Sequence, residues 1–307
     1  MSNDTQYMQI ALRLARRGLG RSWPNPAVGC VIVKAGRILG RGWTQPGGRP
    51  HAETVALDQA HDRYGATDLA GATAYVTLEP CNHHGETPPC TDALIGAKID
   101  RVVVGCTDPD PRVGGGGIKG LRAAGIIVTE NILTAEAREL NGGFIQRVQS
   151  GRPLVTLKTA STADSRIATR SGASQWITGP AARERVHLMR AQTDAILVGI
   201  DTVMHDDPQL TCRLSGLEEH SPVRVVLDSR LRIADDAQLV TTARSVPTWV
   251  VTRDDSERKR MERLKTAGVE VMQVAGDAAG RVDIALALAA LGERGITRIM
   301  VEAGAVL

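Results

Sequence analysis

Residues 50–53, PHAE, and residues 77–90, TLEPCNHHGETPPC, decide the fold expected for the first half of this chain of 307 residues. Cys81 follows Glu53 by 28 positions, and eight residues separate Cys81 from Cys90. Apolar strands that alternate with helices predict an α/β layered domain whose sheet is covered on both faces. The apolar segments around the motifs are 27–33, 73–78 and 101–105, and the helical patterns are 52–62 and 90–97.

One imidazole and two thiolates in this order predict a catalytic zinc site held by His51, Cys81 and Cys90. Zinc takes three protein ligands in catalytic sites and leaves the fourth tetrahedral position for water. One neutral histidine and two thiolates offset the charge of the dication, so the site can be buried. His51 and Cys90 each stand where a helix is expected to begin. There the helix dipole is expected to favour the thiolate of Cys90.

Glu53 is not needed as a ligand, so it is free to move a proton from the attacking water to a ring nitrogen and a departing amine. Zinc makes hydroxide available near neutral pH because it lowers the pKa of water to about 7. The pattern H-x-E with P-C-x-x-C is typical of nucleobase deaminases, although the second spacing is longer here. Two alternatives stay open. One is a structural zinc site with His83 or His84 as fourth ligand, and the other is two core thiols beside a surface histidine.

A second series of strands follows Gly151-Arg152-Pro153, which predicts two domains, residues 1–148 and residues 149–307. Six strands in alternation with helices predict a mostly parallel, Rossmann-like sheet. The sequence stops at residues 301–307 with what resembles the beginning of a helix, so we expect the second domain to be truncated. The six expected strands are 154–158, 195–199, 223–228, 248–252, 269–273 and 298–302, with helices near 180–191, 255–267 and 283–291.

Composition argues against nucleic-acid and membrane partners. The net charge is +3 and aromatic residues make up 3% of the chain, with a single phenylalanine, Phe144. A surface for single-stranded nucleic acid usually offers several exposed rings. No apolar run approaches the roughly 20 residues that span a bilayer, and the first residues do not form a signal peptide. We therefore expect a cytoplasmic enzyme. The chain has five cysteines, an odd number, which argues against a disulfide framework.

The segment TLEPCNHHGETPPCTDALIGA, together with HAE and Asn25-Pro26-Ala27-Val28-Gly29, resembles the bifunctional riboflavin-biosynthesis deaminase/reductase family. The likeness continues through the second half, for example in Ser174-Gln175-Trp176-Ile177-Thr178 and Arg190-Ala191-Gln192, and covers essentially the whole chain. It implies a cytidine-deaminase-like three-layer domain followed by a dihydrofolate-reductase-like domain. It also implies hydrolytic deamination of 2,5-diamino-6-ribosylamino-4(3H)-pyrimidinone 5′-phosphate, then NADPH-dependent reduction of the ribosyl group to ribityl. By the same likeness, we expect a homo-oligomer, a dimer or a tetramer.

The resemblance also implies roles for single residues. Glu53 would shuttle protons beside the zinc, and Asn25 and His83 would orient the pyrimidine. Thr202 and Gly304 would lie near the nicotinamide cofactor. The positions that match the reductase substrate pocket are Lys158, Asp164, Ser174, Trp176, Arg190, Asp207, Arg213 and Glu302.

Two of these assignments have physical support and a plain alternative. Arg190 and Arg213 are candidates for clamping a phosphate because guanidinium forks match phosphate oxygens. They could equally be solvated or structural arginines. Trp176 could equally pack in a core, which is the usual place of a tryptophan.

The chain departs from the family pattern at several positions. Glu86 and Thr44 stand where the family usually has a basic residue and a histidine. Thr162-Ala163-Asp164-Ser165 replaces S-L-D-G, and Glu302-Ala303-Gly304 replaces E-G-G. These departures leave a second hypothesis, a deaminase whose substrate is shifted and whose second domain is not a working reductase. A third hypothesis is a non-enzymatic, zinc-stabilised oligomerisation protein.

Overall fold

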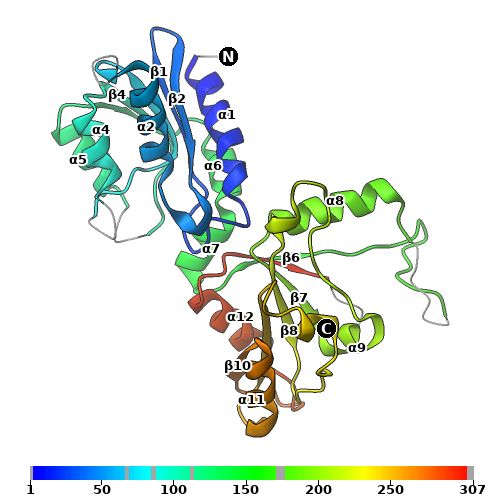
Figure 1. The fold of residues 1–307 in the computed structure, drawn as a ribbon. Helices are drawn as coiled ribbons and strands as arrows, with labels where there is room; N and C mark the ends of the chain where they lie inside the picture. Colours follow the sequence, from blue (N-terminus) through cyan, green and yellow to red (C-terminus); the bar gives the residue numbers. More distant parts are fainter. Residues whose placement is uncertain (1–2, 66–68, 84–87, 111–113, 171–176, 303–307) are drawn as a thin grey trace. The chain divides into compact units, whose positions relative to one another are not determined.

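The structure is a computed structural model that describes residues 3–65, 69–83, 88–110, 114–170 and 177–302. The chain divides into two compact units, Met1–Ser150 and Gly151–Leu307 (Figure 1). Both units are α/β, as predicted from the alternation of apolar strands and helices. Within the described residues, no helix combines the length and the apolar character that a membrane crossing requires.

A five-stranded mixed sheet with the order β2-β1-β3-β4-β5 forms the centre of the first unit. β1 runs antiparallel to β2 and β3, whereas β3, β4 and β5 are parallel. The predicted strands are present, and β2 and β5 are additional. The strands are β1 (Gly29–Lys34), β2 (Arg37–Trp43), β3 (Thr73–Leu78), β4 (Arg101–Cys106) and β5 (Ile127–Thr129).

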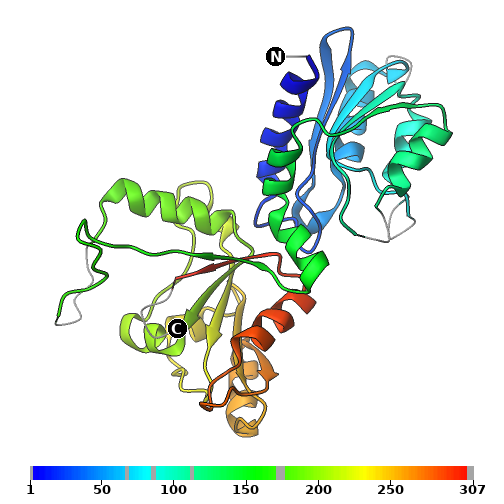
Figure 2. The same cartoon turned by 180° about the vertical axis from the view of Figure 1, so that it is seen from behind.

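Helices cover both faces of this sheet, so the unit has three layers (Figures 1 and 2). α1 and α6 contact each other on one face, while α2, α4 and α5 pack in succession on the other. Two 3₁₀ turns, η1 (Arg16–Gly18) and η2 (Pro46–Gly48), connect the elements. The helices are α1 (Asn3–Ala15), α2 (Ala52–Tyr64), α4 (Cys90–Gly96), α5 (Gly116–Ala123), α6 (Thr134–Leu140) and α7 (Gly142–Ser150).

Glycine in β2 allows α2 to lie directly on the sheet. A Cβ built on Gly42 would lie 2.1 Å from the carbonyl oxygen of Ala52, far inside van der Waals contact. Ala52 is the first residue of α2, and His51 is its N-cap. The close approach of strand and helix therefore sets the position of His51.

The second unit has a six-stranded sheet with the order β10-β9-β8-β7-β11-β6. All neighbouring strands are parallel, which confirms the Rossmann-like sheet predicted from the sequence. The six predicted strands are all present, each within two residues of its expected bounds. They are β6 (Leu154–Leu157), β7 (Ala195–Gly199), β8 (Val223–Leu227), β9 (Thr248–Arg253), β10 (Glu270–Val274) and β11 (Arg298–Val301).

The parallel register brings the ends of distant strands to one edge of the second sheet. Val301 of β11 pairs with Leu157 of β6 and with Leu197 of β7. Ligands of open α/β sheets bind outside the carboxyl ends of the strands, so this edge is where a site is expected. The helices of the unit are α8 (Pro180–Ala191), α9 (Ile200–Asp206), α10 (Gln238–Thr241), α11 (Arg258–Ala267) and α12 (Ile284–Glu293), with a 3₁₀ turn η3 (Glu218–His220).

Candidate functional site

Three side chains in the first unit converge on a point that suits a tetrahedral metal ion. The Nδ1 atom of His51 lies 3.3 Å from Sγ of Cys90 and 3.6 Å from Sγ of Cys81. All three donor atoms lie within 4.8 Å of one another. Ligands about 2.1–2.3 Å from a tetrahedral zinc ion stand roughly 3.5 Å apart. The donor set and its spacing therefore fit zinc.

Local structure explains why these ligands meet. α2 and α4 pack against each other. His51 is the N-cap of α2, and Cys90 is the first residue of α4, as predicted. Cys81 follows the end of β3, and its Sγ accepts a hydrogen bond from the backbone N–H of Cys90 at 3.3 Å. The site thus joins two helix starts to the end of a central strand.

The thiols of Cys81 and Cys90 differ in acidity. A metal dication bound between them would stabilise both as thiolates. Hydrogen bonds from the Cys90 thiol, from His51 and from the Cys90 amide lower the pKa of Cys81 to about 4. The hydrogen bond with Cys81, burial and the charge of Glu53 raise the pKa of Cys90. Two adjacent thiolates repel each other unless a cation lies between them. The amide at the start of α4 donates to the sulfur of Cys81 and contributes to its lowered pKa, whereas a zinc ion bound to both sulfurs would hold both as thiolates.

Glu53 lies directly behind the metal ligands. Its side chain is in the first turn of α2, with only 3% of the residue exposed. Burial, with the charge of Cys81 nearby, raises the pKa of Glu53 to about 7. A buried carboxyl group beside a metal site and shielded from bulk water is suited to moving protons.

Asn25 is held by a neighbour that the sequence interpretation did not single out, Gly48. The Asn25 Nδ2 atom donates to the carbonyl oxygen of Gly48 at 3.2 Å. Gly48 has a φ of +87°, and a Cβ there would lie 2.0 Å from Nδ2 of Asn25. The one available signal was the Gly-Gly pair just before Arg49-Pro50-His51.

Glu79 is a second residue that the sequence interpretation missed. It lies two positions before Cys81 and is buried. Its carboxylate accepts hydrogen bonds from the backbone N–H groups of Asp108, Gly115 and Ile118 at 3.2, 2.9 and 3.1 Å. The carboxylate therefore ties the end of β3 to the loop after β4, and it supports the segment that carries Cys81.

The other positions that the sequence analysis singled out in the first unit are Thr44, His83 and Glu86. Thr44 is buried, and its hydroxyl accepts a hydrogen bond from the Val28 N–H at 2.9 Å, so it stabilises the start of β1. His83 is exposed on the loop after Cys81, and its role in orienting the pyrimidine stays a prediction. Glu86 lies outside the described residues.

In the second unit, three predicted residues meet at the carboxyl edge of the sheet. Arg190 of α8 makes a two-pronged ion pair with Glu302, which follows β11, with distances of 2.8 and 2.9 Å. The two side chains are only 11% and 10% exposed. Lys158, which follows β6, lies 4.0 Å from Glu302. Arg190 also donates to the carbonyl oxygen of Thr211 at 2.9 Å, so it serves mainly as a structural arginine.

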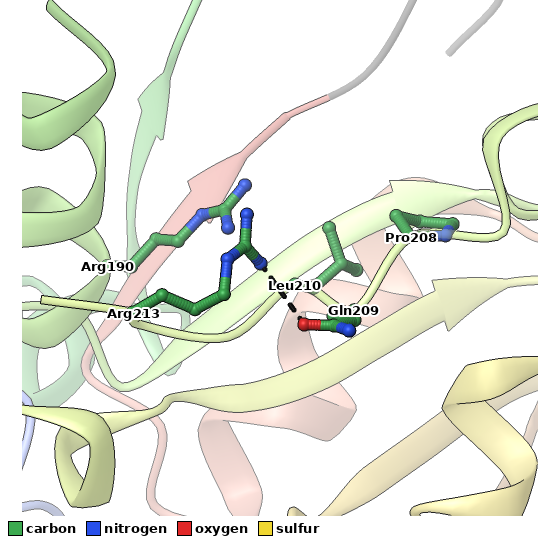
Figure 3. A pocket seen from close by; sticks show the side chains of 5 residues that line it. All are labelled: Arg190, Pro208, Gln209, Leu210 and Arg213. Atoms are coloured by element: carbon green, nitrogen blue, oxygen red, sulfur yellow. Dashed lines mark hydrogen bonds between the residues drawn. The ribbon is translucent and has the colours of Figure 1, made fainter. Parts of the chain in front are cut away.

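A pocket of about 380 Å³ lies beside this ion pair. It is lined by Arg190, Pro208, Gln209, Leu210 and Arg213, and Figure 3 shows the guanidinium groups of Arg190 and Arg213 side by side. Arg213 is exposed, and its Nη1 reaches Gln209 Oε1 and Thr211 Oγ1 only at 3.5 Å each. Its guanidinium therefore keeps donors for an anionic ligand.

The other predicted residues of this unit do not all join the pocket. The Asp207 carboxylate accepts hydrogen bonds from Gln238 at the start of α10, and Asp164 accepts from Thr162 in an exposed turn. Thr202 is half-buried in the first turn of α9, directly after β7. Ser174, Trp176, Ala303 and Gly304 lie outside the described residues.

The three-layer fold of the first unit and its donor set define the class of zinc-dependent deaminases, here joined to a second, Rossmann-like unit. Two family models match the chain. Residues 1–106 match the zinc-binding region of cytidine and deoxycytidylate deaminases, and residues 153–307 match the RibD C-terminal domain. The chain belongs to the RibD family of riboflavin biosynthesis proteins.

Similar proteins cover both units. The chain is 44% identical to RibD of Aquifex aeolicus over 98% of its own length and 81% of that protein. It is 43% identical to RibD of Escherichia coli, with 99% and 82% covered. The crystal structure of a diaminohydroxyphosphoribosylaminopyrimidine deaminase/5-amino-6-(5-phosphoribosylamino)uracil reductase from Thermotoga maritima is 40% identical, with a TM-score of 0.84 over 98% of this chain and 80% of that one. This likeness confirms the predicted fold class in both units.

Proposed function

We propose that the chain deaminates 2,5-diamino-6-ribosylamino-4(3H)-pyrimidinone 5′-phosphate and then reduces the ribosyl group of the product to ribityl. Members of the family combine a deaminase and a reductase in one chain, and they act in riboflavin biosynthesis. The observation that carries the proposal is the convergence of His51, Cys81 and Cys90 with the buried Glu53 behind them. The match to the reductase domain argues against the deaminase-only alternative.

In the first reaction the chain's residues bind zinc and move protons. A zinc ion on these ligands supplies Lewis-acid activation of water near neutral pH. The Glu53 carboxylate accepts a proton from the attacking water and donates it to the ring nitrogen. It then accepts the second proton, from the hydroxyl group of the tetrahedral adduct, and delivers it to the departing amine, so that ammonia leaves as the carbonyl forms. Asn25, fixed against Gly48, and His83 orient the pyrimidine ring.

In the second reaction the pocket beside Arg190 holds the substrate phosphate. NADPH supplies the hydride, and the carboxyl edge of the parallel sheet, with Thr202 in the first turn of α9, suits such a cofactor. Arg213 contributes the available guanidinium donors. Glu302 and Lys158 lie next to the pocket at the strand ends, where they can contact the sugar.

Mass spectrometry of the products separates the two activities. The zinc-loaded protein is incubated with the pyrimidine phosphate, with and without NADPH. Without NADPH, the product should have exchanged its amine for oxygen. With NADPH, the product should also have gained two hydrogens. A product that never gains hydrogen would restore the deaminase-only alternative, and an unchanged substrate would contradict the proposal.

A homo-oligomer, dimer or tetramer, stays a prediction that rests on the resemblance, and a cytoplasmic location stays a prediction that rests on composition and on the first residues of the sequence. The family's enzymes act on a phosphorylated small molecule, and the proposal needs no nucleic-acid or membrane partner. Sedimentation equilibrium of the purified chain tests the oligomeric state, and a single monomeric species would contradict that part.

Gly48→Ala is expected to raise the KM of the deaminase for the pyrimidine by about tenfold, because the new methyl group would displace Asn25. Gly47→Ala is the matched control, since Gly47 also has a positive φ, +75°, but nothing lies within 4 Å of its Cβ position. Both variants strain the backbone, and only the first reaches Asn25. Steady-state ammonia release measures the difference. Equal KM values for the two variants would show that Asn25 does not orient the substrate.

A further inference from the structure

The segment Asp207–Arg213, here called the pocket loop, has a backbone that its own residues do not favour. Asp207 has a φ of +38° and Leu210 a φ of +54°, values that are uncommon for residues other than glycine. Such conformations persist only where the surroundings impose them. Side chains from other elements supply that restraint. They are Gln238 on the Asp207 oxygen, Arg224 on the Gln209 oxygen, Arg190 on the Thr211 oxygen, Ser221 on the Cys212 N–H and His187 on the Arg213 N–H.

His187 is the restraint that acts on the backbone of Arg213 itself. It lies in α8, three positions before Arg190, and is half-buried. Its Nδ1 atom lies 3.3 Å from the backbone nitrogen of Arg213 and 3.2 Å from the carbonyl oxygen of Thr211. Nδ1 can accept from the first or donate to the second, but it cannot do both. The Thr211 oxygen already has a donor in Arg190 at 2.9 Å, so the acceptor role fits the site better.

Burial and the charges around His187 favour its neutral ring. Burial, together with the positive charges of Arg190 and Arg213, lowers the pKa of His187, and the hydrogen bond with the Thr211 carbonyl oxygen and the charge of Glu302 oppose this as smaller effects. A neutral imidazole has one unprotonated ring nitrogen, which is the acceptor that the Arg213 N–H requires. The electrostatics therefore agree with the geometry.

We propose that His187 is a positioning residue for the reductase: by accepting the backbone N–H of Arg213, it holds that arginine toward the phosphate of the substrate. This inference rests on the proposed function. Among the residues that the structure describes, the Arg213 guanidinium has hydrogen bonds of 3.5 Å and none shorter, so its direction depends on where its backbone is held. Loss of the restraint weakens phosphate binding in the ground state and the transition state alike. Such a change raises KM and leaves kcat unchanged.

Two variants separate the acceptor from the bulk of the side chain. His187→Phe keeps a ring but has no acceptor, whereas His187→Asn offers an oxygen near the position of Nδ1. His187→Phe is expected to raise the reductase KM about five- to tenfold, the effect of one net hydrogen bond, with kcat within about twofold. His187→Asn should restore the wild-type KM. Ammonia release by the same preparations should not change, because the deaminase residues lie in the other unit.

A double-mutant cycle tests whether His187 acts through Arg213. In an Arg213→Met background, His187→Phe should raise KM no further, because the group that it positions is gone. Additive effects, a failure of His187→Asn to rescue, or a fall in kcat at constant KM would each overturn the proposal.

A titration with inorganic phosphate tests the role of His187 separately from the proposed function on which it rests. If the wild-type chain shows no reduction, the proposed function fails, and the role of His187 is then measured by calorimetric titration with phosphate alone. His187→Phe should raise the phosphate Kd and His187→Asn should not. Equal Kd values for wild type and His187→Phe would overturn the positioning role.

Discussion

Glu53→Gln is expected to lower kcat for ammonia release by about 10²–10⁴-fold, the usual contribution of a general acid–base group. Glutamine has the same shape as glutamate but cannot accept the proton of the attacking water or deliver one to the leaving amine. Glu53 is 3% exposed, so bulk water cannot replace it. His51, Cys81 and Cys90 remain, so the variant should still bind zinc.

Three measurements isolate the proton transfer from other damage. The zinc content of Glu53→Gln should equal that of the wild type, and its reductase activity on the deaminated pyrimidine should be unchanged. Glu136→Gln makes the same chemical change at an exposed position in the first turn of α6, and it should leave ammonia release intact. Wild-type ammonia release by a zinc-loaded Glu53→Gln protein would refute the proposed mechanism.

Glu302→Ala is expected to destabilise the second unit by about 3–5 kcal/mol, because it leaves the Arg190 guanidinium buried without its counterion. The Arg190 side chain is only 11% exposed, and the pair has two short contacts of 2.8 and 2.9 Å. Native-state hydrogen exchange of the β7 and β11 amides measures the loss. The β3 amides of the first unit serve as the internal control. A loss under about 1 kcal/mol would show that the pair behaves as a surface salt bridge.

A double variant separates the structural role of this pair from its role in the reaction. Arg190→Met with Glu302→Met removes both charges, and replacement of a buried ion pair by apolar side chains is often neutral or stabilising. The double variant should therefore recover most of the stability that Glu302→Ala loses. Its reductase activity should stay below that of the wild type even where stability is recovered, because the pocket then lacks the guanidinium of Arg190 beside that of Arg213. Recovery of activity together with stability would show that the pair is structural only.

Some strands were predicted from the sequence and others were missed, and the difference has a physical reason. The inner strands of the second sheet, β9, β8, β7 and β11, are parallel and largely buried, so their sequences are mostly apolar runs that are easily recognised. β2, RILGRGW, was missed because two glycines and two arginines interrupt its apolar pattern. Those glycines are what lets α2 pack on the strand. β5 has three residues at the edge of its sheet, and it is partly exposed.

In the candidate sites, too, some residues could be predicted from the sequence and others could not. The zinc ligands were predictable because each is part of a short motif, beside a helix start for His51 and Cys90 and after a strand for Cys81. Gly48 and Glu79 were not, since their roles depend on contacts with Asn25 and with the loop after β4. Asp207 and Arg190 matched the family pattern. The structure nevertheless engages the carboxylate of Asp207 at the start of α10, and it engages the Nε and Nη2 groups of Arg190 in an ion pair with Glu302.

The sequence by itself determined the alternation of strands and helices, and it predicted the metal donors that the structure brings together and the proton-transfer residue. These features are local, because each depends on residue type and on spacing within a short segment. Only the tertiary structure decided which thiol is the more acidic, which arginine remains available to an anion and what holds that arginine in place. Those properties come from burial and from contacts between residues far apart in the chain, such as Arg190 and Glu302, and no local pattern encodes them.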